Sequence, residues 1–212
     1  EYGDMIATNP CGEQPLLGYE SCNLGSINVA KFVSVKGSSE AWEESINWDR
    51  LQHVVRNAVH FLDNVIDAND YSIPEIKEMT RATRKIGLGV MGFADLLIKL
   101  RVPYNSEEAR LVGDEIMRFI NQVASIKSLE MGSLRGTFPA WEQSAYKVQE
   151  NYRNACRLTV APTGTISMIA GCASGIEPLF ALAWRKQNIL EGQTLFYINE
   201  KFEEDAKENG FY

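Results

Sequence analysis

The stretch Asp49–Asn69, DRLQHVVRNAVHFLDNVIDAN, has the clearest structural pattern in the chain. Its apolar residues recur at steps of three and four, which is the spacing of one face of an amphipathic helix. They are Leu51, Val54, Val55, Ala58, Val59, Leu62, Val65 and Ile66. Either Asn47 or Asp49 suits the start of this helix, because a short polar side chain accepts a backbone N–H there. The sequence therefore predicts a long helix with one buried face.

Two more helices are predicted downstream. Pro74 suits the first turn of a helix over 74–83, because its fixed φ is already helical. Ser106 is the expected N-cap of a longer helix, and Gly132 is suited to end it. The inner face of this third helix is expected to contain Ala109, Val112, Ile116, Phe119, Ile120, Val123 and Ile126.

Short apolar segments between these helices suit strands. They cover residues 26–33, 157–161, 179–184 and 194–198. Nearly continuous apolar character is typical of strands covered on both faces. Because long helices separate the strands, the pattern indicates an α/β fold with parallel pairing. The most polar loop surrounds Gly37 and is the expected place for length variation.

The composition is that of a globular protein with a sizeable core. Of the 212 residues 45% are hydrophobic and 23% are charged, and the net charge is −7. This charge argues against a nucleic-acid-binding surface, which needs a basic face. No apolar run reaches the about 18 residues that cross a membrane. The N-terminus does not resemble a secretory signal, so the cytoplasm is the expected compartment.

Four cysteines are too few for a disulfide scaffold, and they lack the spacing of zinc ligands, so no metal is expected. Cys156 and Cys172 are expected to be small buried side chains. The chain starts at Glu1 rather than Met and stops after an apparent helix. It therefore reads like a piece of a longer protein.

The motif NPCGE places an amide (Asn9), a thiol (Cys11) and a carboxylate (Glu13) at alternate positions. In an extended loop these side chains would project to the same side and face one ligand. A nearby carboxylate raises a thiol pKa, so a thiolate nucleophile is disfavoured and hydrogen-atom abstraction by sulfur fits better. Cys22, past a turn at Gly18, is expected to return close to Cys11. The residues alone suit an ordinary Cys-Gly turn equally well.

The segment APTGTIS, residues 161–167, follows a predicted strand. Consecutive backbone N–H groups with Thr and Ser hydroxyls can form an uncharged anion site. The alternative is an ordinary strand-to-helix turn in which Thr and Ser act as caps, and the residues alone favour it. No GK[ST] follows, so this is not a Walker A loop. Upstream, Gly87, Gly89 and Gly92 are expected to permit close packing of chain segments.

Four segments resemble the large chains of ribonucleotide reductases. NPCGEQPLL followed by ESCNLGSIN is similar, at matching spacing, to the active-site loop of that family. APTGTISMIAGCASGIEPLF resembles its phosphate-binding turn, and its PTGTIS and SGIEP motifs are most similar to those of the cobalamin-dependent and related branches. RKIGLGVMGFADLLIKLRVPYNSEEA and LRGTFPAWEQSAY match as well. The resemblance therefore covers nearly the whole chain.

The resemblance implies a role for each matching residue. Cys11 would become a thiyl radical that takes the ribose 3′ hydrogen, and Glu13 would be the general base on the 3′-hydroxyl. Asn9 would hydrogen-bond the ribose hydroxyls, and Cys22 would be one of two thiols that oxidise to a disulfide. The substrate phosphates would lie at Pro162, Thr163, Gly164, Thr165, Ile166 and Ser167.

The resemblance also implies a ten-stranded α/β barrel with the cysteine loop at its centre. Residues 1–212 would form a single partial domain, the loop and the C-terminal half-barrel. Compared with the family, the chain lacks the upstream partner of Cys22, the effector-binding region and dimer helices, and the C-terminal cysteine tail.

The activity expected from the resemblance is the reduction of ribonucleoside diphosphates to deoxyribonucleotides for DNA synthesis. Adenosylcobalamin is the expected radical source, with a separate metallo-subunit as the alternative. The expected partners are the nucleotide, a thioredoxin- or glutaredoxin-type reductant, the rest of the catalytic chain and, in the full protein, a second copy. Neither nucleic acid nor a membrane is expected. The competing hypothesis is a non-catalytic fragment, or companion half-chain, that binds nucleotide only when assembled and is inactive alone.

Overall fold

The computed structural model of the chain describes residues 3–34, 39–148, 150–189 and 192–211. Its α-helices are α1 (Trp48–Ala68), α2 (Pro74–Thr83), α3 (Phe93–Leu100), α4 (Glu107–Arg135), α5 (Gly164–Ile169) and α6 (Glu200–Glu208). Its strands are β1 (Ala7–Thr8), β2 (Pro15–Leu16), β3 (Asn23–Asn28), β4 (Ile86–Met91), β5 (Ala183–Ile189) and β6 (Gln193–Ile198). Short 3₁₀ helices cover Val29–Phe32, Ser39–Ser45, Pro139–Gln143 and Ala145–Val148. The predicted polar loop around Gly37 lies outside the described residues.

The parallel pair β3–β4 is the centre of the fold, with Asn23 opposite Ile86 and Asn28 opposite Met91. On the other side of β4, Leu88 forms a parallel bridge with Leu158. Residues 156–159 thus run beside β4 as a third extended segment. The N–H groups of Ile86 and Leu88, two residues apart, donate to the adjacent carbonyls of Cys156 and Arg157 at 3.0 and 2.9 Å. This mismatch is a bulge, which ends regular pairing there.

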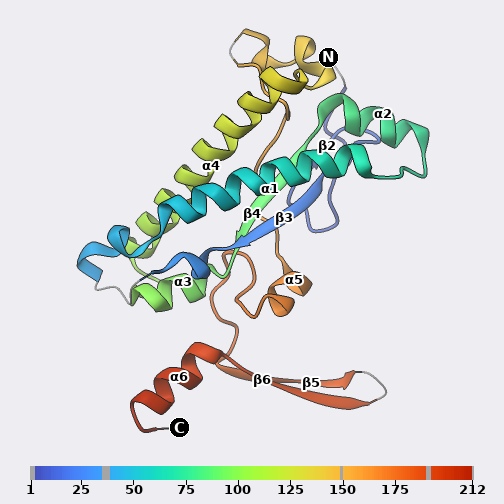
Figure 1. Cartoon of the computed structure of the whole chain (residues 1–212). Coiled ribbons are helices and arrows are strands. Elements are labelled where there is room, and N and C mark those ends of the chain that lie inside the picture. Colours follow the sequence, from blue (N-terminus) through green and yellow to red (C-terminus); the bar gives the residue numbers. More distant parts are fainter. Residues whose placement is uncertain (1–2, 35–38, 149, 190–191, 212) are drawn as a thin grey trace.

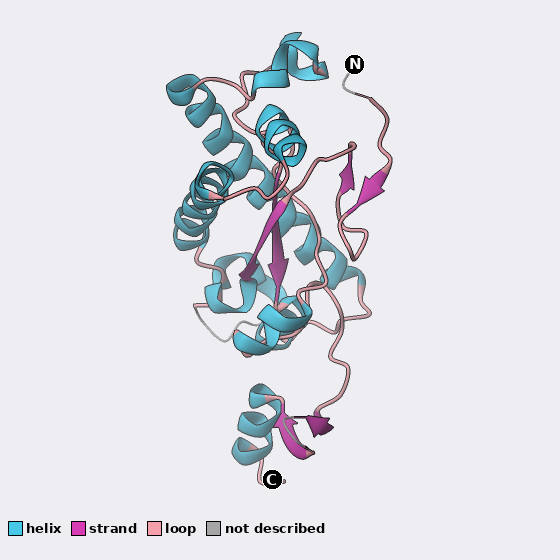
Figure 2. Cartoon of the chain, turned by 90° about the vertical axis from the view of Figure 1, so that its right-hand side faces the viewer, coloured by secondary structure: helices cyan, strands magenta, loops and turns pink. Residues whose placement is uncertain are grey.

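Helices α1 and α4 pack on one face of this sheet (Figure 1). Viewed from the side, the short β1–β2 hairpin lies on the opposite side of the strands from these helices (Figure 2). The apolar stripe of α1 meets the sheet as the helical spacing predicted: Leu51, Val55, Val59, Leu62 and Ile66 are buried. They pack with Ile86, Leu88 and Val90 of β4 and with Val112, Ile116 and Ile120 of α4.

The helix predictions are confirmed, with corrections at their ends. Asn47, rather than Asp49, caps α1, since its side chain accepts the Arg50 N–H at 2.9 Å. Ser106 caps α4 as predicted, by accepting the Ala109 N–H at 3.1 Å. Gly132 does not end α4, because the helix continues to Arg135 and stops at Gly136, whose φ of +85° favours glycine. Ile126 is 44% exposed, so its place on the inner face was wrong.

The strand predictions are less accurate. The predicted strand over 26–33 begins earlier, at Asn23, and turns into a 3₁₀ helix at Val29. The one over 157–161 is reduced to the bridge at Leu158. The one over 179–184 overlaps β5 only at its end, since β5 begins at Ala183. No strand was predicted over β4, Ile86–Met91. β5 and β6 pair antiparallel rather than parallel, and the described residues of β6 are mostly exposed.

A buried cluster of charges joins α1 to the start of β4. The Asp63 carboxylate, fully buried in α1, accepts from Arg84 Nε at 2.9 Å and from Asn154 Nδ2 at 3.0 Å. Asn154 also accepts from the Ser128 hydroxyl of α4 at 2.9 Å. Through Asn154, this cluster fixes the chain that leads into residues 156–159.

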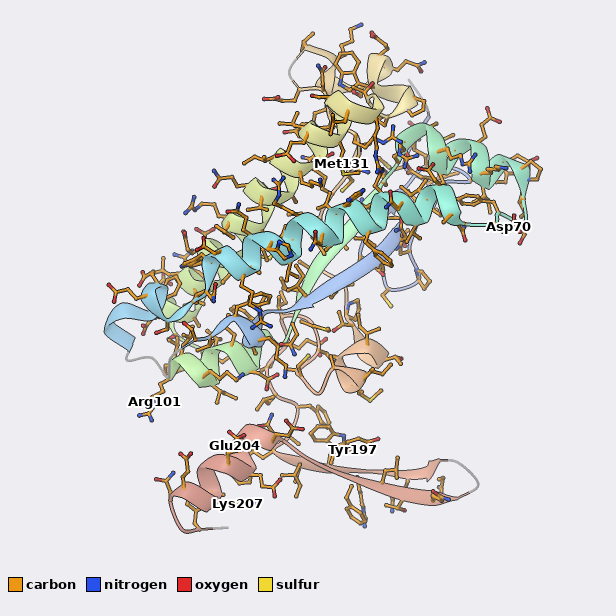
Figure 3. The ribbon with its side chains drawn as sticks, viewed as in Figure 1. Asp70, Arg101, Met131, Tyr197, Glu204 and Lys207 are labelled. Carbon is orange, nitrogen blue, oxygen red and sulfur yellow. The ribbon has the colours of Figure 1, made fainter. Side chains whose placement is uncertain are left out.

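The C-terminal hairpin β5–β6 and α6 extend away from the sheet (Figure 1). In Figure 3, Tyr197 lies on this hairpin, and Glu204 and Lys207 lie on α6, below the sheet in that view. Trp184 stacks on Tyr197 with ring centroids 5.4 Å apart, which links the two strands through their side chains.

The described strands form three two-stranded sheets and do not close into a barrel. The mixture of helices with a parallel strand pair agrees with the predicted α/β class. Among the described helices, none combines the length and the apolar character that a membrane span requires.

Candidate active site

The cysteine motif lies at the tip of the β1–β2 hairpin. Ala7 pairs with Leu16, and the Asn9 N–H donates to the Gln14 carbonyl at 3.2 Å. The Gly12 N–H donates back to the Asn9 carbonyl at 2.9 Å, and the φ of Gly12 is +76°. This left-handed backbone favours glycine and turns the chain. The prediction of an extended loop with alternate side chains on one side was therefore wrong.

The hairpin places its predicted site residues in different surroundings. Asn9 is buried, and its Nδ2 donates to the Cys22 carbonyl at 3.5 Å. Cys11 is exposed at the tip. Glu13 is half-buried, and its Oε2 atom is buried without a hydrogen-bond partner. The structure thus brings Asn9 to Cys22, whereas the closeness of Cys11 to Cys22 stays a prediction.

One arm of the hairpin is fixed to residues 156–159. The Thr159 hydroxyl donates to the Glu13 carbonyl. The Gln14 Nε2 donates to the Cys156 sulfur at 3.4 Å. Cys156 was predicted to be a small buried side chain, but it is half-buried and makes polar contacts.

A buried ion pair fixes the same arm farther along the chain, at β2. The Lys85 ammonium donates to the Pro15 carbonyl at 3.1 Å and to Glu20 Oε2 at 2.8 Å. Glu20 Oε2 also accepts the Leu17 N–H at 2.8 Å, so the carboxylate closes the turn that follows β2. The side chains of Glu20 and Lys85 are only 0% and 8% exposed.

Cys22 lies at the base of the hairpin as a neutral thiol. Burial raises the pKa of Cys22 to about 12. The neighbouring groups Cys156, Glu20 and Glu13 raise this pKa further, and the positive charge of Lys85 lowers it. A thiol with this pKa carries almost no thiolate at neutral pH, so the site disfavours ionic nucleophilic attack by Cys22.

Glycines on the same side of the sheet make room for these contacts, as predicted. A Cβ at Gly89 would lie 2.5 Å from the Thr159 carbonyl oxygen. A Cβ at Gly87 would lie 2.9 Å from Thr159 Cγ2 and 3.3 Å from the Cys22 sulfur. At Gly92, with φ +72°, it would lie 2.5 Å from an Asn28 side-chain oxygen. Thr159 and Cys22 therefore approach β4 closely only because Gly87 and Gly89 lack side chains.

The predicted phosphate turn leads into α5. Thr163 has φ +56°, and its hydroxyl accepts the Gly175 N–H at 2.7 Å instead of capping the helix. Ser167 is buried, with its hydroxyl 3.0 Å from that of Ser174. The segment is therefore a turn into a helix, as in the alternative interpretation, but the Thr163 side chain does not cap α5. Gly164, Thr165 and Ile166 are exposed, and the first N–H groups of a helix have no partner within it.

Four polar residues that hold the hairpin were absent from the predicted site: Gln14, Glu20, Lys85 and Thr159. Nothing in the sequence marks Glu20 and Lys85 as buried, since charged side chains are mostly exposed. The glycines opposite Thr159 were the available signal, because they indicated that another segment passes close to β4.

The chain is similar to known proteins over nearly its whole length. A family model described as the ribonucleotide reductase barrel domain matches residues 1–152 and 147–212. A vitamin B12-dependent ribonucleoside-diphosphate reductase of Thermoplasma acidophilum is 54% identical over 211 residues, covering 99% of this chain and 26% of the relative. A protein of the same name from Mycobacterium tuberculosis H37Rv is 49% identical over 210 residues, covering 99% of this chain and 28% of the relative.

A more distant relative is the ribonucleoside-diphosphate reductase subunit alpha of Chlamydia trachomatis. It is 32% identical over 220 residues, which cover 85% of this chain and 20% of the relative. The chain spans between 26% and 29% of the length of the vitamin B12-dependent relatives.

Proposed function

The chain belongs to the ribonucleotide reductase barrel family, and from that premise we propose that it carries the radical cysteine loop of a ribonucleoside-diphosphate reductase. The observation that carries the proposal is the fixed hairpin. It presents the Cys11 thiol at an exposed tip and has the neutral Cys22 thiol at its base. Sulfur radical chemistry needs uncharged thiols, and this arrangement supplies one beside the loop.

Each side chain of the loop has a proposed role. A thiyl radical at Cys11 takes the 3′ hydrogen atom of the ribose and returns it to C3′ at the end of the cycle, which regenerates the radical. The Glu13 carboxylate, whose buried Oε2 has no hydrogen-bond partner, accepts the 3′-hydroxyl proton. Asn9 hydrogen-bonds the ribose hydroxyls. As the 2′-hydroxyl leaves as water, Cys22 and a second thiol outside this chain each give up one hydrogen atom and join in a disulfide.

Adenosylcobalamin is the proposed radical source, on the basis of the names of the relatives from Thermoplasma and Mycobacterium. When bound, it supplies the unpaired electron that Cys11 requires. The exposed Cys11 thiol fits such an external source, and it is the residue of this chain that would face it. The alternative source is a separate metallo-subunit.

The substrate phosphates are proposed to lie at the turn formed by Pro162, Thr163, Gly164, Thr165, Ile166 and Ser167. The hydroxyls of Thr163 and Ser167 are engaged inside the turn. The exposed backbone N–H groups of residues 164–166 and the Thr165 hydroxyl are therefore the groups available to an anion. A diphosphate is proposed because the relatives are named diphosphate reductases.

The proposed architecture of the complete protein is a ten-stranded barrel in which β3, β4 and residues 156–159 are neighbouring parallel members. Residues 1–212 would then be one partial domain, the C-terminal half of that barrel. Its partners would be the remainder of the catalytic chain, a thioredoxin- or glutaredoxin-type reductant and a second copy. All four cysteines are free thiols, which suits a cytoplasmic reaction cycle.

The test uses the complete reductase that contains this chain. Cys11→Ser is expected to abolish deoxynucleotide formation while nucleotide binding, measured by equilibrium dialysis, persists. Cys172→Ser is the matched control and should retain turnover, since the contacts of Cys172, with the Ser167 carbonyl and beside Gly92, do not include the hairpin. Normal turnover of Cys11→Ser would refute the radical assignment. Turnover with adenosylcobalamin as the sole added cofactor supports it as the radical source, whereas a strict need for a second subunit contradicts it.

The competing proposal, a chain that is inactive unless assembled, is favoured by one observation. Among the described strands, β3 has β4 as its hydrogen-bonded neighbour and no partner on its other edge. An open parallel edge leaves backbone groups unpaired. The chain alone is expected to show no reductase turnover, and measurable turnover by this chain alone would contradict that expectation.

A further inference from the structure

The buried pair of Lys85 and Glu20 is an unusual way to hold a hairpin. Their Nζ and Oε2 atoms are 2.8 Å apart, and both side chains are almost fully buried. Burying two charges costs several kcal/mol of desolvation, and apolar residues of similar volume often hold a protein at least as well. The charges therefore point to a role besides stability.

The position of Lys85 suggests that role. Asn23 is opposite Ile86 in the parallel register, so the residues just before them, Cys22 and Lys85, lie at the same level. Neighbouring strands are about 4.8 Å apart, and opposite residues project to the same face. On that face the next residue of β4 is Gly87, where a Cβ would lie 3.3 Å from the Cys22 sulfur. No side chain from Gly87 fills the space beside the thiol.

We propose that Lys85 is a positioning residue whose charge, fixed by Glu20 and the Pro15 carbonyl, stabilises the thiolate that Cys22 becomes when its disulfide is reduced. This inference rests on the proposed function, because only there does Cys22 enter a disulfide.

The reductive step is ordinary thiol–disulfide exchange with a protein dithiol. A thiolate of the dithiol attacks the sulfur that is bonded to Cys22. The disulfide bond breaks, and its electron pair leaves on the Cys22 sulfur. The second thiol of the reductant then resolves the mixed disulfide. The reductant ends as a disulfide, and its two protons end on the two site thiols.

The environment of Cys22 explains why this step needs a cation. Burial raises the pKa of Cys22 to about 12, and a thiol of high pKa is a slow leaving group. The charged or titratable groups that act on it are Cys156, Lys85, Glu20 and Glu13. Lys85 is the group in this set that favours the thiolate. Removing its charge should therefore slow any chemistry in which Cys22 becomes anionic.

The first experiment measures the alkylation rate of Cys22 by iodoacetamide in the reduced protein, with mass spectrometry of its peptide, from about pH 7 to about pH 9. Lys85→Met is expected to slow alkylation about tenfold at each pH, because it removes a neighbouring opposite charge. Glu20→Gln is expected to speed it about threefold, because it removes a like charge. Lys85→Arg should retain the wild-type rate within about twofold.

The opposite signs separate the charge of Lys85 from simple loosening of the hairpin. If the pair only held the hairpin closed, both variants would expose Cys22 and both would react faster, which would overturn the proposal. Unchanged rates would overturn it as well. Lys77→Met, at an exposed lysine of α2, is the matched control, and Cys172 is the internal reference thiol.

A fold-preserving variant guards against loss of structure. The double variant Lys85→Met/Glu20→Gln leaves no unpaired buried charge, so it should fold like the wild type. Its Cys22 should still react more slowly than in the wild type, because Lys85 acts on this thiol more strongly than Glu20 does. A rate equal to or above the wild-type rate would overturn the proposal.

Turnover in the complete reductase provides a second readout. In Lys85→Met/Glu20→Gln, multiple turnovers that depend on a dithiol reductant should slow about threefold more than a single turnover of pre-reduced enzyme does. Equal losses in both would mean that Lys85 serves the whole loop, contrary to the proposal. The alkylation readout needs no turnover, so a failure of the proposed function remains distinguishable from a failure of this inference.

Discussion

The two faces of the β3–β4 sheet are built on different principles. The face toward α1 and α4 presents Ile86, Leu88 and Val90, all of which are buried among apolar side chains. The face toward the cysteine hairpin presents Gly87 and Gly89 at the alternate positions of the same strand, and Lys85 directly before it. One strand thus supplies a dense apolar core on one side and space, charge and thiol contacts on the other.

The difference shows how a short hairpin is placed accurately. The helix face makes β4 rigid because its side chains interlock in a close-packed interior. The hairpin face then lets another segment approach the backbone of β4, because glycine leaves no Cβ in the way. One face of β4 therefore contributes the apolar core that stabilises the fold, and the opposite face allows another segment to approach the strand closely.

Leu88→Ala tests the helix face and should have the largest effect. The side chain is 1% exposed in the main core, so its truncation is expected to lower the free energy of unfolding by about 3 kcal/mol. Leu24→Ala, on the hairpin face and 38% exposed, is the matched control with an expected loss below about 1 kcal/mol. Chemical denaturation measures both, and equal losses would remove the contrast between the faces.

Gly89→Ala tests the hairpin face. The added Cβ would lie 2.5 Å from the backbone oxygen of Thr159, so one of the segments must shift, at an expected cost of about 2 kcal/mol. Gly87→Ala should cost less, because the atoms it meets belong to the side chains of Leu24, Thr159 and Cys22, which have rotamers to change. Thermal unfolding of the two variants ranks them, and the reverse ranking would contradict this account.

The stability of the protein at alkaline pH depends on the buried Cys22 thiol. Burial raises the pKa of Cys22 from 9.0 to about 12, so the folded state keeps a proton that the unfolded state releases above pH 9. Stability should therefore fall as the pH rises from about 8 to about 10, by about 1 kcal/mol from this group. Cys22→Ser should lose that part of the pH dependence.

The matched control for that measurement is Cys11→Ser, at the exposed tip of the hairpin. It should keep the full alkaline loss of stability. Cys172 contributes in the same direction, since burial raises its pKa to about 11, so a residual loss in Cys22→Ser is expected. An unchanged pH dependence in Cys22→Ser would show that its thiol is not kept neutral by the fold.

The smallest expected effect concerns the start of α1 on the helix face. Asn47→Ala removes the side chain that accepts the Arg50 N–H, at an expected cost of about 1 kcal/mol. Asp49→Ala, two residues later, should cost clearly less, because that carboxylate is not the cap. Urea denaturation of the Asn47→Ala and Asp49→Ala variants measures both losses and identifies the residue that caps the helix.

Much of the helix face could be predicted from the sequence, and little of the hairpin face. The spacing of Leu51, Val55 and Val59 determines which side of α1 is buried, and the same spacing identified α4. In β4, however, the alternation is between apolar residues and glycines, which does not read as a strand. The next predicted strand, over 157–161, is reduced to the bridge at Leu158, because its pairing with β4 is irregular where the adjacent carbonyls of Cys156 and Arg157 accept from Ile86 and Leu88.

The candidate site also has a part that could be predicted from the sequence and a part that could not. The motif around Cys11 is local, so its spacing was visible from the resemblance to a family. The groups that hold it come from elsewhere in the chain: Lys85 and Glu20 are 65 residues apart, and Thr159 and Glu13 are 146 apart. Such long-range polar contacts have no periodic pattern. They can be identified only after the fold has brought the segments together.

The hydrogen bond from the Thr159 hydroxyl to the Glu13 carbonyl has a consequence for chain length. This bond joins Thr159, at one end of residues 159–163, to the loop that carries Cys11. At the other, the Thr163 hydroxyl is tied to Gly175, at the start of the turn. Four residue steps separate these two anchors, and a fully extended chain covers at most about 14 Å in that length. Insertions and deletions should therefore be tolerated far less here than in a surface loop, because a single added residue would change the reach between thiol and turn by about 3.5 Å.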